Sequence, residues 1–501
     1  MPTEVIPRKP KRWKTATASA LILLSIVGFG LSWHALYRVD ETIKEISNNK
    51  NPIDTMVYSV IVRADDTLEN ADQVEETRVG YYENTSLQTI SNMLPNNAGA
   101  PVKSYNSYPE LVSALYNGEE RVIFFDEAFR DIVSMSHPNF LYETRILRAS
   151  DNEYLLKLNE EREKGMGNFR LQTPNTLPNN EARPTDFQGN EIVEIKNEKD
   201  EVVGTSIIVP QESTMAQESL ETLEEAAIQT QTPVQVQVQE GRQITGHEPF
   251  IAFLSGIDTY GGIDTRSNSD VNIVMAVNPQ KKQVVIVPIP RDSYVPIVGT
   301  GGYKDKLTHA GALGLANTAK TAGAVLGVPI DVYVKVNFST LVKGVDLLGG
   351  ITVNNPRAFT SAGGIHFAAG NIRLSGSQAL AFSRERKAFG SGDFERGRNQ
   401  GRVIEGIINE ALKPNNLLNY SNLFSMMGGT FRTNVSDAAI RTYAQNELNN
   451  MGRWSIETVS LSGNGVTGLP SYFLPRYRLS FIVLDQGSIM NVRSNLISVI
   501  S

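Results

Sequence analysis

The chain has no cysteine, and only five of its 501 residues are histidine. The absence of cysteine excludes disulfides, thiolate-bound zinc and catalysis by a thiol nucleophile. Positive charge is also in deficit, since the formal net charge is −7 and no long Lys/Arg tract occurs beyond the N-terminus. This balance argues against nucleic acid as a partner. A chain without disulfides suits the outer face of a bacterium that uses few of them.

Only one long apolar run is present, at residues 15–33, directly after the basic segment 8–14. Its 19 uncharged residues nearly span a bilayer core of about 30 Å. We predict a cytoplasmic tail at 1–14 and a transmembrane helix at 15–36 in a single-pass protein of the cell membrane. The basic flank places the N-terminus in the cytoplasm and most of the chain outside. A cleaved signal peptide is the alternative, but the run lacks a clear small-x-small cleavage site.

The length of the chain exceeds one typical domain, so two folded units are expected. Residues 50–171 alternate short strands and helices and predict a small α/β accessory domain. Residues 172–245 are rich in Asn, Gln, Glu, Thr and Pro and predict a polar linker. Within it, 191–195 and 202–209 suit a hairpin, and the alternating Val-Gln stretch suits an extended tether more than an edge strand. Residues 246–501 predict an α/β domain with a mixed central sheet flanked by helices.

Periodicity gives the expected elements of both units. In the small unit we expect strands at 56–62 and 121–125 and helices at 85–94 and 108–116. In the large unit we expect strands at 250–257, 271–277, 284–290 and 331–337 and helices at 309–326, 339–348, 378–386 and 395–412. The final hundred residues supply further elements, ending in 478–484 and 487–500. Ser375 and Gln378 suit a capping box. Asp126 and Glu127 follow a strand without a nearby His, Arg or Gly-rich partner, so no catalytic site is predicted there.

The strands at 271–277 and 284–290 are joined by a polar turn and predict a hairpin. Symmetric pairing about that turn puts Asp270 opposite Arg291, because 270 + 291 equals 277 + 284. The strand at 250–257 ends at Asp258. Three charged residues therefore stand at strand ends, where α/β sheets usually keep a ligand site.

The helix at 395–412 buries Val403, Ile404, Ile407 and Ile408, and Arg396 and Gln400 continue this face toward its N-terminus. Arg398 and Arg402 follow the adjacent row and are predicted to be solvated. Arg384 and Arg386 are two residues apart and cannot share one face of a regular helix. For any one of these arginines alone, a surface salt bridge is the simpler interpretation.

Together, the charged residues predict an anion site. The cations are Arg291, Lys306, Arg384, Arg386 and Arg396, and the acids are Asp258, Asp270 and Asp393. If these residues converge, the excess positive charge needs an anion, because unpaired buried charge costs several kcal/mol per ion. A pyrophosphate fits, since its oxygens accept bidentate arginine bonds and bridge Mg²⁺. Carboxylates without His or Cys favour such a hard ion over zinc.

Seven ordered blocks between residues 250 and 501 resemble the signature blocks of the LytR-CpsA-Psr family. They are SGIDTY (255–260), NSDVN (268–272), PIPRDS (288–293), KDKLTHA (304–310), VDLLGG (345–350), FSRER (382–386) and GDFERGRNQ (392–400). Residues 55–146 resemble the accessory domain of the capsule-type CpsA branch, through position and the motifs VGYY (79–82) and VIFFD (122–126).

The resemblance implies an enzyme that moves a glycan polymer from undecaprenyl pyrophosphate to peptidoglycan outside the membrane. It implies a Mg²⁺ ion, or Mn²⁺, on Asp258 and Asp270, and an apolar tunnel for the polyprenyl chain. The implied pyrophosphate ligands are Arg291, Lys306, Arg384, Arg386, Arg396 and Gln400. Phe338, Leu341, Val345 and Leu348 are candidates for the tunnel, although ordinary core is the better default for any single one. The accessory segment favours capsule or exopolysaccharide, with capsule-export or tyrosine-kinase-type assembly proteins as further partners.

One position departs from the family pattern. Members commonly carry Arg two residues before the second aspartate, where this chain has Asn268, and Arg266 is the candidate replacement. We expect Arg291, Arg384 and Asp393 to act in catalysis, with Asp393 or a metal-bound aspartate as general base. A non-catalytic binder or regulator of lipid-linked glycan and a simple polyprenyl-pyrophosphate phosphatase are the alternatives.

Overall fold

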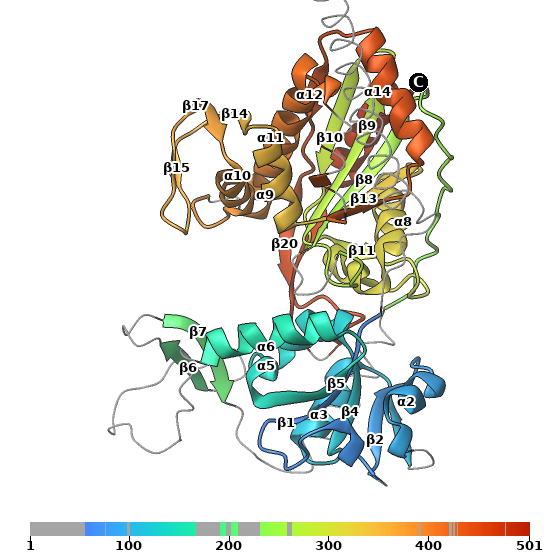
Figure 1. The fold of residues 1–501 in the computed structure, drawn as a ribbon, viewed down its shortest axis with the longest axis vertical. Helices are drawn as coiled ribbons and strands as arrows, with labels where there is room; N and C mark the ends of the chain where they lie inside the picture. Colours follow the sequence, from blue (N-terminus) through green and yellow to red (C-terminus); the bar gives the residue numbers. More distant parts are fainter. Residues whose placement is uncertain are drawn as a thin grey trace, which may run out of the picture.

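The computed structural model describes residues 56–75, 77–97, 101–166, 191–196, 202–208, 231–257, 263–389, 392–419, 423, 426–427, 429–475 and 477–501. Most of these residues form two α/β units, one with a five-stranded and one with a six-stranded sheet (Figure 1). The predicted cytoplasmic tail and transmembrane helix lie outside the described residues. Within them, no helix is long and apolar enough to cross a membrane.

The small unit is built on a mixed sheet with strand order β3-β2-β4-β1-β5. Its central strand, β4 (Val122–Asp126), is buried at every position because the sequence VIFFD is apolar without alternation. β2 is parallel to β3 and β4, whereas β1 is antiparallel to β4 and β5. The other elements are β1 (Tyr58–Arg63), η1 (Ala71–Gln73), β2 (Val79–Tyr82), α2 (Leu87–Met93), η2 (Pro95–Asn97), β3 (Val102–Tyr105), α3 (Tyr108–Tyr116), η3 (Glu127–Phe129), α4 (Arg130–Ser136), α5 (Phe140–Glu143), β5 (Thr144–Ala149) and α6 (Asn152–Met166).

Glu127 has an arginine partner, so the prediction that none lies nearby is wrong. Arg130 donates from Nη2 to Glu127 Oε1 at 2.9 Å, and Tyr154 donates from its hydroxyl to Glu127 Oε2 at 2.8 Å. The Glu127 side chain is fully buried, and that of Arg130 is 7% exposed. The i, i+3 spacing that allows this pair is visible in the sequence.

The linker contains the expected hairpin, β6 (Glu191–Lys196) paired antiparallel with β7 (Val202–Ile208). Residues 231–245 form neither helix nor strand and lie along the large unit. Gln231 accepts from the backbone N–H of Lys304 at 2.9 Å, and Val234 donates its N–H to the Gly302 carbonyl at 3.1 Å. The described part of the Val-Gln stretch is therefore an extended segment, as predicted.

The large unit has a six-stranded sheet in the order β18-β13-β8-β9-β10-β19. β8 (Phe250–Ile257) is parallel to β13 (Val332–Asn337) and antiparallel to β9 (Val271–Asn278). β9 and β10 (Gln283–Pro288) form the predicted hairpin with Val277 opposite Val284. β19 (Ser455–Thr458) is parallel to β10, and β18 (Phe431–Thr433) is antiparallel to β13. The predicted register is thus confirmed.

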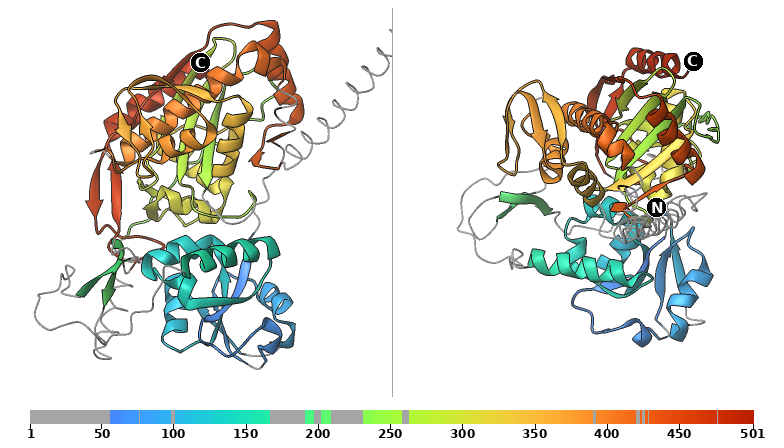
Figure 2. Two further views of the ribbon diagram at one scale, coloured as in Figure 1. Left: turned by 60° about the vertical axis from the view of Figure 1, so that its left-hand side comes forward. Right: turned by 45° about the horizontal axis from the view of Figure 1, so that its top comes forward.

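Helices cover both faces of this sheet (Figure 2). Because side chains alternate along β9, Val274 packs with α8 (Leu315–Leu326) and α15 (Gln486–Ile500) on one face. Ile273 packs with Ile404 and Ile408 of α11 (Asp393–Ala411) on the other. The remaining elements are β11 (Tyr294–Pro296), β12 (Lys304–Lys306), η4 (Leu307–Leu313), α9 (Phe338–Leu347), β14 (Ile351–Asn355), β15 (Phe359–Thr360), β16 (His366–Phe367), β17 (Gly370–Leu374), α10 (Gly376–Arg384), α12 (Pro414–Leu418), α14 (Asp437–Asn449), β20 (Gly463–Thr467) and β21 (Ser480–Leu484).

Two helix predictions need correction. The single helix expected at 309–326 is a 3-10 turn, η4, followed by α8, and the break falls at Gly314 with φ 105°. A glycine adopts this conformation readily and other residues do not. α10 starts at the predicted Ser375–Gln378 capping box but ends at Arg384, two residues early.

The two units share an apolar contact. Phe473 and Leu474 of the large unit pack against the core of the small one, and the Phe473 ring centroid lies 5.9 Å from that of Phe129. Asp305 holds this loop in place, because it accepts hydrogen bonds from Ser471 Oγ at 2.7 Å and from the Phe473 N–H at 2.8 Å. The small unit therefore docks against the end of the large unit that bears β11, as seen in Figure 1.

Candidate active site

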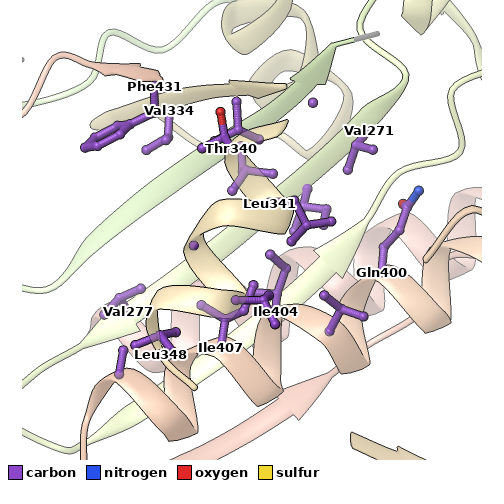
Figure 3. Close-up of a pocket in the computed structure, with 18 of the residues that line it drawn as sticks. Val271, Val277, Val334, Thr340, Leu341, Leu348, Gln400, Ile404, Ile407 and Phe431 are labelled. Carbon is purple, nitrogen blue, oxygen red and sulfur yellow. The ribbon is translucent and has the colours of Figure 1, made fainter. Parts of the chain in front are cut away.

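A long cavity lies between the sheet and helices α9 and α11, and its volume is about 1230 Å³. This exceeds the roughly 300–1,000 Å³ of typical small-molecule sites. Its central walls are apolar, with Val271 and Val277 of β9, Leu341 of α9 and Ile404 of α11 facing the same space (Figure 3). The four tunnel candidates from the sequence all line it: Phe338, Leu341, Val345 and Leu348.

Arg291 and Asp270 meet at one end of the cavity, as the hairpin register predicts. Arg291 donates from Nη1 to Asp270 Oδ1 at 2.6 Å, and both residues line the cavity. Burial works to lower the pKa of Arg291, but the carboxylates of Asp270 and Asp292 outweigh it and raise that pKa. Arg291 is thus a permanent cation in a partly desolvated position.

Lys306 lies behind this pair and is held by an acid that the sequence analysis missed. Its Nζ is 2.9 Å from Asp292 Oδ1, and its side chain is 11% exposed. The Arg291 Nε is 4.0 Å from Asp292 Oδ2, so one carboxylate contacts two cations. Asp292 follows Arg291 directly in the chain, and this adjacency was the available signal. Lys306 does not line the cavity itself.

Arg384 and Arg386 both reach the cavity because α10 ends between them. Glu385 adopts an extended conformation and accepts backbone N–H groups from Ala362, Arg386 and Ala388 at 2.6, 3.0 and 2.9 Å. Burial would raise the pKa of Glu385, but these hydrogen bonds lower it. The carboxylate is therefore a fixed anchor for the turn. Arg384 covers the Phe338 ring at 4.5 Å, which is cation–π distance.

The first turns of α11 supply Asp393, Arg396 and Gln400. Arg396 and Gln400 line the cavity, and Arg396 forms an ion pair with Asp393. Burial raises the pKa of Asp393 in spite of the ion pair with Arg396. Burial also lowers the pKa of Arg396, with repulsion from Arg291 and Arg386 adding to the effect. Mutual repulsion of this kind is what an anion would relieve.

Arg398 and Arg402 point away from this cluster, but they are ion-paired rather than simply solvated. Both bond the same carboxylate, that of Glu395, with Arg398 Nη2 at 2.7 Å and Arg402 Nη1 at 2.9 Å. Arg402 also donates to Asn399 Oδ1 at 2.6 Å. The helix therefore separates its neutralised arginines from Arg396.

Asp258, the first predicted metal ligand, lies outside the described residues. Arg266 does not line the cavity; its charge acts instead on Asp126 and Tyr58 of the small unit. This position does not support a pyrophosphate contact by Arg266. Asn268 is 6% exposed.

The described part of the site carries six cations and four carboxylates. The cations are the five predicted ones and Lys387, which also lines the cavity, and the carboxylates are Asp270, Asp292, Glu385 and Asp393, so the balance is 6 − 4 = +2 before Asp258 is counted. No group of three His, Cys, Asp or Glu suited to a metal occurs among the described residues. The carboxylates present offer oxygen ligands of the type that hard divalent cations prefer. The chemistry of the donors therefore fits magnesium better than zinc.

The cavity thus joins a long apolar interior to a cluster of cations. The family comparison agrees with the sequence blocks, because the LytR_cpsA_psr family model matches residues 211–482. That match covers more than half of the chain, and the chain belongs to this family.

Two curated relatives share the name polyisoprenyl-teichoic acid–peptidoglycan teichoic acid transferase TagU. The protein from Bacillus licheniformis is 39% identical over 194 residues, which cover 38% of this chain and 62% of the relative. The protein from Enterococcus faecalis is 38% identical over 226 residues, covering 44% and 73%. A solved structure of TagV from B. subtilis is 27% identical, covers 51% of this chain and 98% of its own, and has a TM-score of 0.43. This score is below the level at which a shared fold follows from it.

Proposed function

We propose that this protein is a phosphotransferase that moves a cell-wall glycopolymer from a polyprenyl pyrophosphate carrier to peptidoglycan. One observation carries the proposal: the cation cluster opens directly into the long apolar cavity. A polyprenyl pyrophosphate has both halves of the matching chemistry. The names of the relatives support the same reaction class.

In this proposal the pyrophosphate lies against Arg291, Arg384, Arg386 and Arg396, with Gln400 as a neutral donor and Lys306 acting through Asp292. These donors stabilise the charge that develops as the phosphoanhydride bond breaks. A Mg²⁺ ion held by Asp270 and Asp258, when bound, would supply further charge neutralisation.

The acceptor hydroxyl of a peptidoglycan sugar attacks the phosphorus that carries the glycan. The new P–O bond forms while the bond to the bridging oxygen breaks, and polyprenyl phosphate leaves. The hydroxyl proton passes to a carboxylate, for which Asp393 is our candidate because its raised pKa makes it a stronger base than an ordinary aspartate. Arg396, which lines the cavity, holds that carboxylate beside it through an ion pair.

We further propose that the protein acts at the outer face of the membrane, anchored by residues 15–36. Two expectations about the polymer differ. The accessory unit resembles that of capsule-type proteins, whereas the relatives from B. licheniformis and E. faecalis are named for teichoic acid. We therefore propose the broader class of glycopolymer. Transfer rates with a capsule-bearing and a teichoic-acid-bearing donor would distinguish the two polymers.

The test uses the full chain in detergent with Mg²⁺, a glycan-bearing polyprenyl pyrophosphate and a peptidoglycan oligosaccharide. We expect joined glycan–peptidoglycan product and released polyprenyl monophosphate, both measured by mass spectrometry. Release without joined product would identify a phosphatase, and stable binding without turnover would identify a sensor. Either result would overturn the proposal.

Arg291→Ala should lower the transfer rate at least about 100-fold, as expected for loss of a preorganised charged donor. Its melting temperature should stay close to wild type. The matched control is Arg373→Ala, which removes an arginine paired with Glu410 at 2.7 Å outside the cavity. A wild-type rate in Arg291→Ala, or an equal loss in Arg373→Ala, would argue against the assigned site.

A further inference from the structure

The cavity has a second end, far from the cation cluster. β9 runs from Val271 beside the cluster to Asn278, roughly 24 Å at about 3.4 Å per residue. α11 runs alongside from Arg396 to Ala411, roughly 22 Å at about 1.5 Å per residue. Both elements line the cavity over this length, and Figure 3 shows Gln400 and Val271 at one end and Val277 and Ile407 toward the other.

At this distal end the apolar lining gives way to a charged pair and an indole. Lys282 Nζ lies 2.7 Å from Glu447 Oε2, and Trp454 donates from Nε1 to Glu447 Oε1 at 3.1 Å. The Lys282 ammonium also lies 5.5 Å from the centre of the Trp454 ring. All three residues line the cavity. We call Lys282, Glu447 and Trp454 the distal cluster.

The distal cluster stands between the apolar tunnel and solvent. The side chains of Lys282 and Glu447 are only 14% and 10% exposed. Other polar residues that line the same end are exposed: His247, Gln280, Asn449 and Asn450. The order along the cavity is therefore apolar wall, buried ion pair, exposed polar rim.

The backbone holds Lys282 across this end. It is the only non-glycine residue in the described chain with positive φ, at 52°, a conformation that a lysine rarely adopts. Its carbonyl accepts the N–H of Ser455 at 2.8 Å. A Cβ on Gly452 would lie 2.8 Å from Lys282 Cε, so the glycine makes room for the lysine side chain. The β9–β10 turn, α14 and the segment from Gly452 to Ser455 thus meet at the distal end of the cavity.

An apolar chain that reaches the distal cluster meets an ion pair whose charges already satisfy each other. To pass, it would have to separate Lys282 from Glu447 and leave both charges partly desolvated, which is strongly unfavourable. Apolar burial, in contrast, favours every additional carbon up to that point. The free energy of binding therefore stops improving where the tunnel meets the pair.

We propose that the distal cluster closes the lipid tunnel and sets the length of polyprenyl chain that the protein binds inside. This inference rests on the proposed function, since it assigns the tunnel to a polyprenyl pyrophosphate. Lys282, Glu447 and Trp454 are specificity-determining residues that act without contact with the reacting phosphates. The simpler alternative is an ion pair that only ties the β9–β10 turn to α14.

The test measures affinity of the full chain in detergent for geranyl, farnesyl, geranylgeranyl, octaprenyl and undecaprenyl pyrophosphate. For wild type we expect affinity to rise with chain length and then level off, because each buried CH₂ adds about fourfold until the tunnel is full. In Trp454→Ala and in the double variant Lys282→Ala/Glu447→Ala, the levelling should move to longer chains. The longest chains should bind these variants at least about tenfold more tightly than they bind wild type, from two or more extra buried methylenes. Geranyl pyrophosphate, which is too short to reach the distal cluster, should bind wild type and these variants with equal affinity.

Lys320→Ala/Glu240→Ala is the matched control, because it removes an ion pair of 2.9 Å between α8, on the other face of the sheet, and the segment before β8. Its length profile should be that of wild type. Should Trp454→Ala fail to fold, Ile407→Trp narrows the tunnel from α11 and should move the levelling to shorter chains.

An unchanged length profile in the distal-cluster variants, with normal binding of every lipid by wild type, would overturn this inference and leave the proposed function standing. A lower melting temperature with that same profile would identify a purely structural tie. If wild type binds none of the prenyl pyrophosphates, the proposed function falls and the inference with it.

Discussion

The small and the large unit each bury arginines against carboxylates, but they do so in opposite ways. In the small unit, Glu127 is enclosed by Arg130 and the Tyr154 hydroxyl. None of these three residues lines the large cavity. In the large unit, Arg291 and Arg396 bond carboxylates and still line a cavity where cations are in excess.

The difference separates a structural charge pair from a ligand site. A pair that is neutral and enclosed contributes to stability only as long as both partners are present. A cluster with surplus charge that faces a cavity is complete only with a ligand. Residue types alone do not distinguish the two, but local charge balance and access to a cavity do.

The largest expected effect on stability comes from breaking the enclosed pair. Arg130→Met leaves Glu127 fully buried without its cation, so the free energy of unfolding should fall by about 3–5 kcal/mol. Urea unfolding monitored by circular dichroism measures this change. Below the melting transition, binding of a prenyl pyrophosphate should be unaffected.

Arg121→Met is the control for that substitution. Arg121 pairs with Asp66 at 2.9 Å, but its side chain is 46% exposed, so its loss should have an effect of about 1 kcal/mol or less. The comparison between the units breaks down if Arg130→Met is as stable as Arg121→Met, or if it loses lipid binding while it stays folded.

The contact between the units should make stability depend on pH. Burial raises the pKa of Asp126 to about 7, although the Ala128 N–H and the charge of Arg266 oppose this shift. Between pH 4 and 7 the unfolded chain has lost this proton and the folded chain still holds it. Stability should therefore fall by about 3–4 kcal/mol as the pH rises through this range.

Unfolding at a series of pH values measures this slope, and Asp126→Asn should flatten it. Asp66→Asn is the matched control. The hydrogen bond from Arg121 lowers the pKa of Asp66, so its contribution is lost as the pH falls and has the opposite sign. The same slope in Asp126→Asn and wild type would contradict the assignment.

Local patterns predicted where several residues of the candidate site lie. The hairpin register followed from two apolar strands about one turn, and it placed Arg291 against Asp270. The apolar stripe of α11 identified Arg396 and Gln400 as cavity residues, because helical periodicity fixes which side chains share a face.

The errors have physical causes that short stretches of sequence do not reveal. Gly314 breaks the expected helix, since its φ of 105° depends on how η4 and α8 pack together. Arg384 and Arg386 share the cavity because α10 ends between them, where Glu385 accepts the N–H of Ala362 from a distant loop. The distal cluster joins Lys282 to Glu447 across 165 residues of chain. Such contacts are products of tertiary packing.

The smallest effect on stability and transfer rate is expected for Arg398→Ala, which is compared with Arg396→Ala in the same helix. Arg398→Ala removes a residue that is 35% exposed and shares Glu395 with Arg402, so the carboxylate keeps a partner at 2.9 Å. Stability should fall by less than about 1 kcal/mol, and the transfer rate should change by no more than about twofold. Arg396→Ala, two residues earlier, should lower the rate as Arg291→Ala does. Its stability should change little, because relief of the burial of Arg396 and of its repulsion from Arg291 and Arg386 offsets the lost ion pair with Asp393. Initial rates and thermal unfolding of both variants give the measurement. Equal loss of activity in Arg398→Ala and Arg396→Ala would show that charge balance around α11 does not separate ligand-binding arginines from structural ones. The distinction drawn between the two units would then fail within the large unit itself.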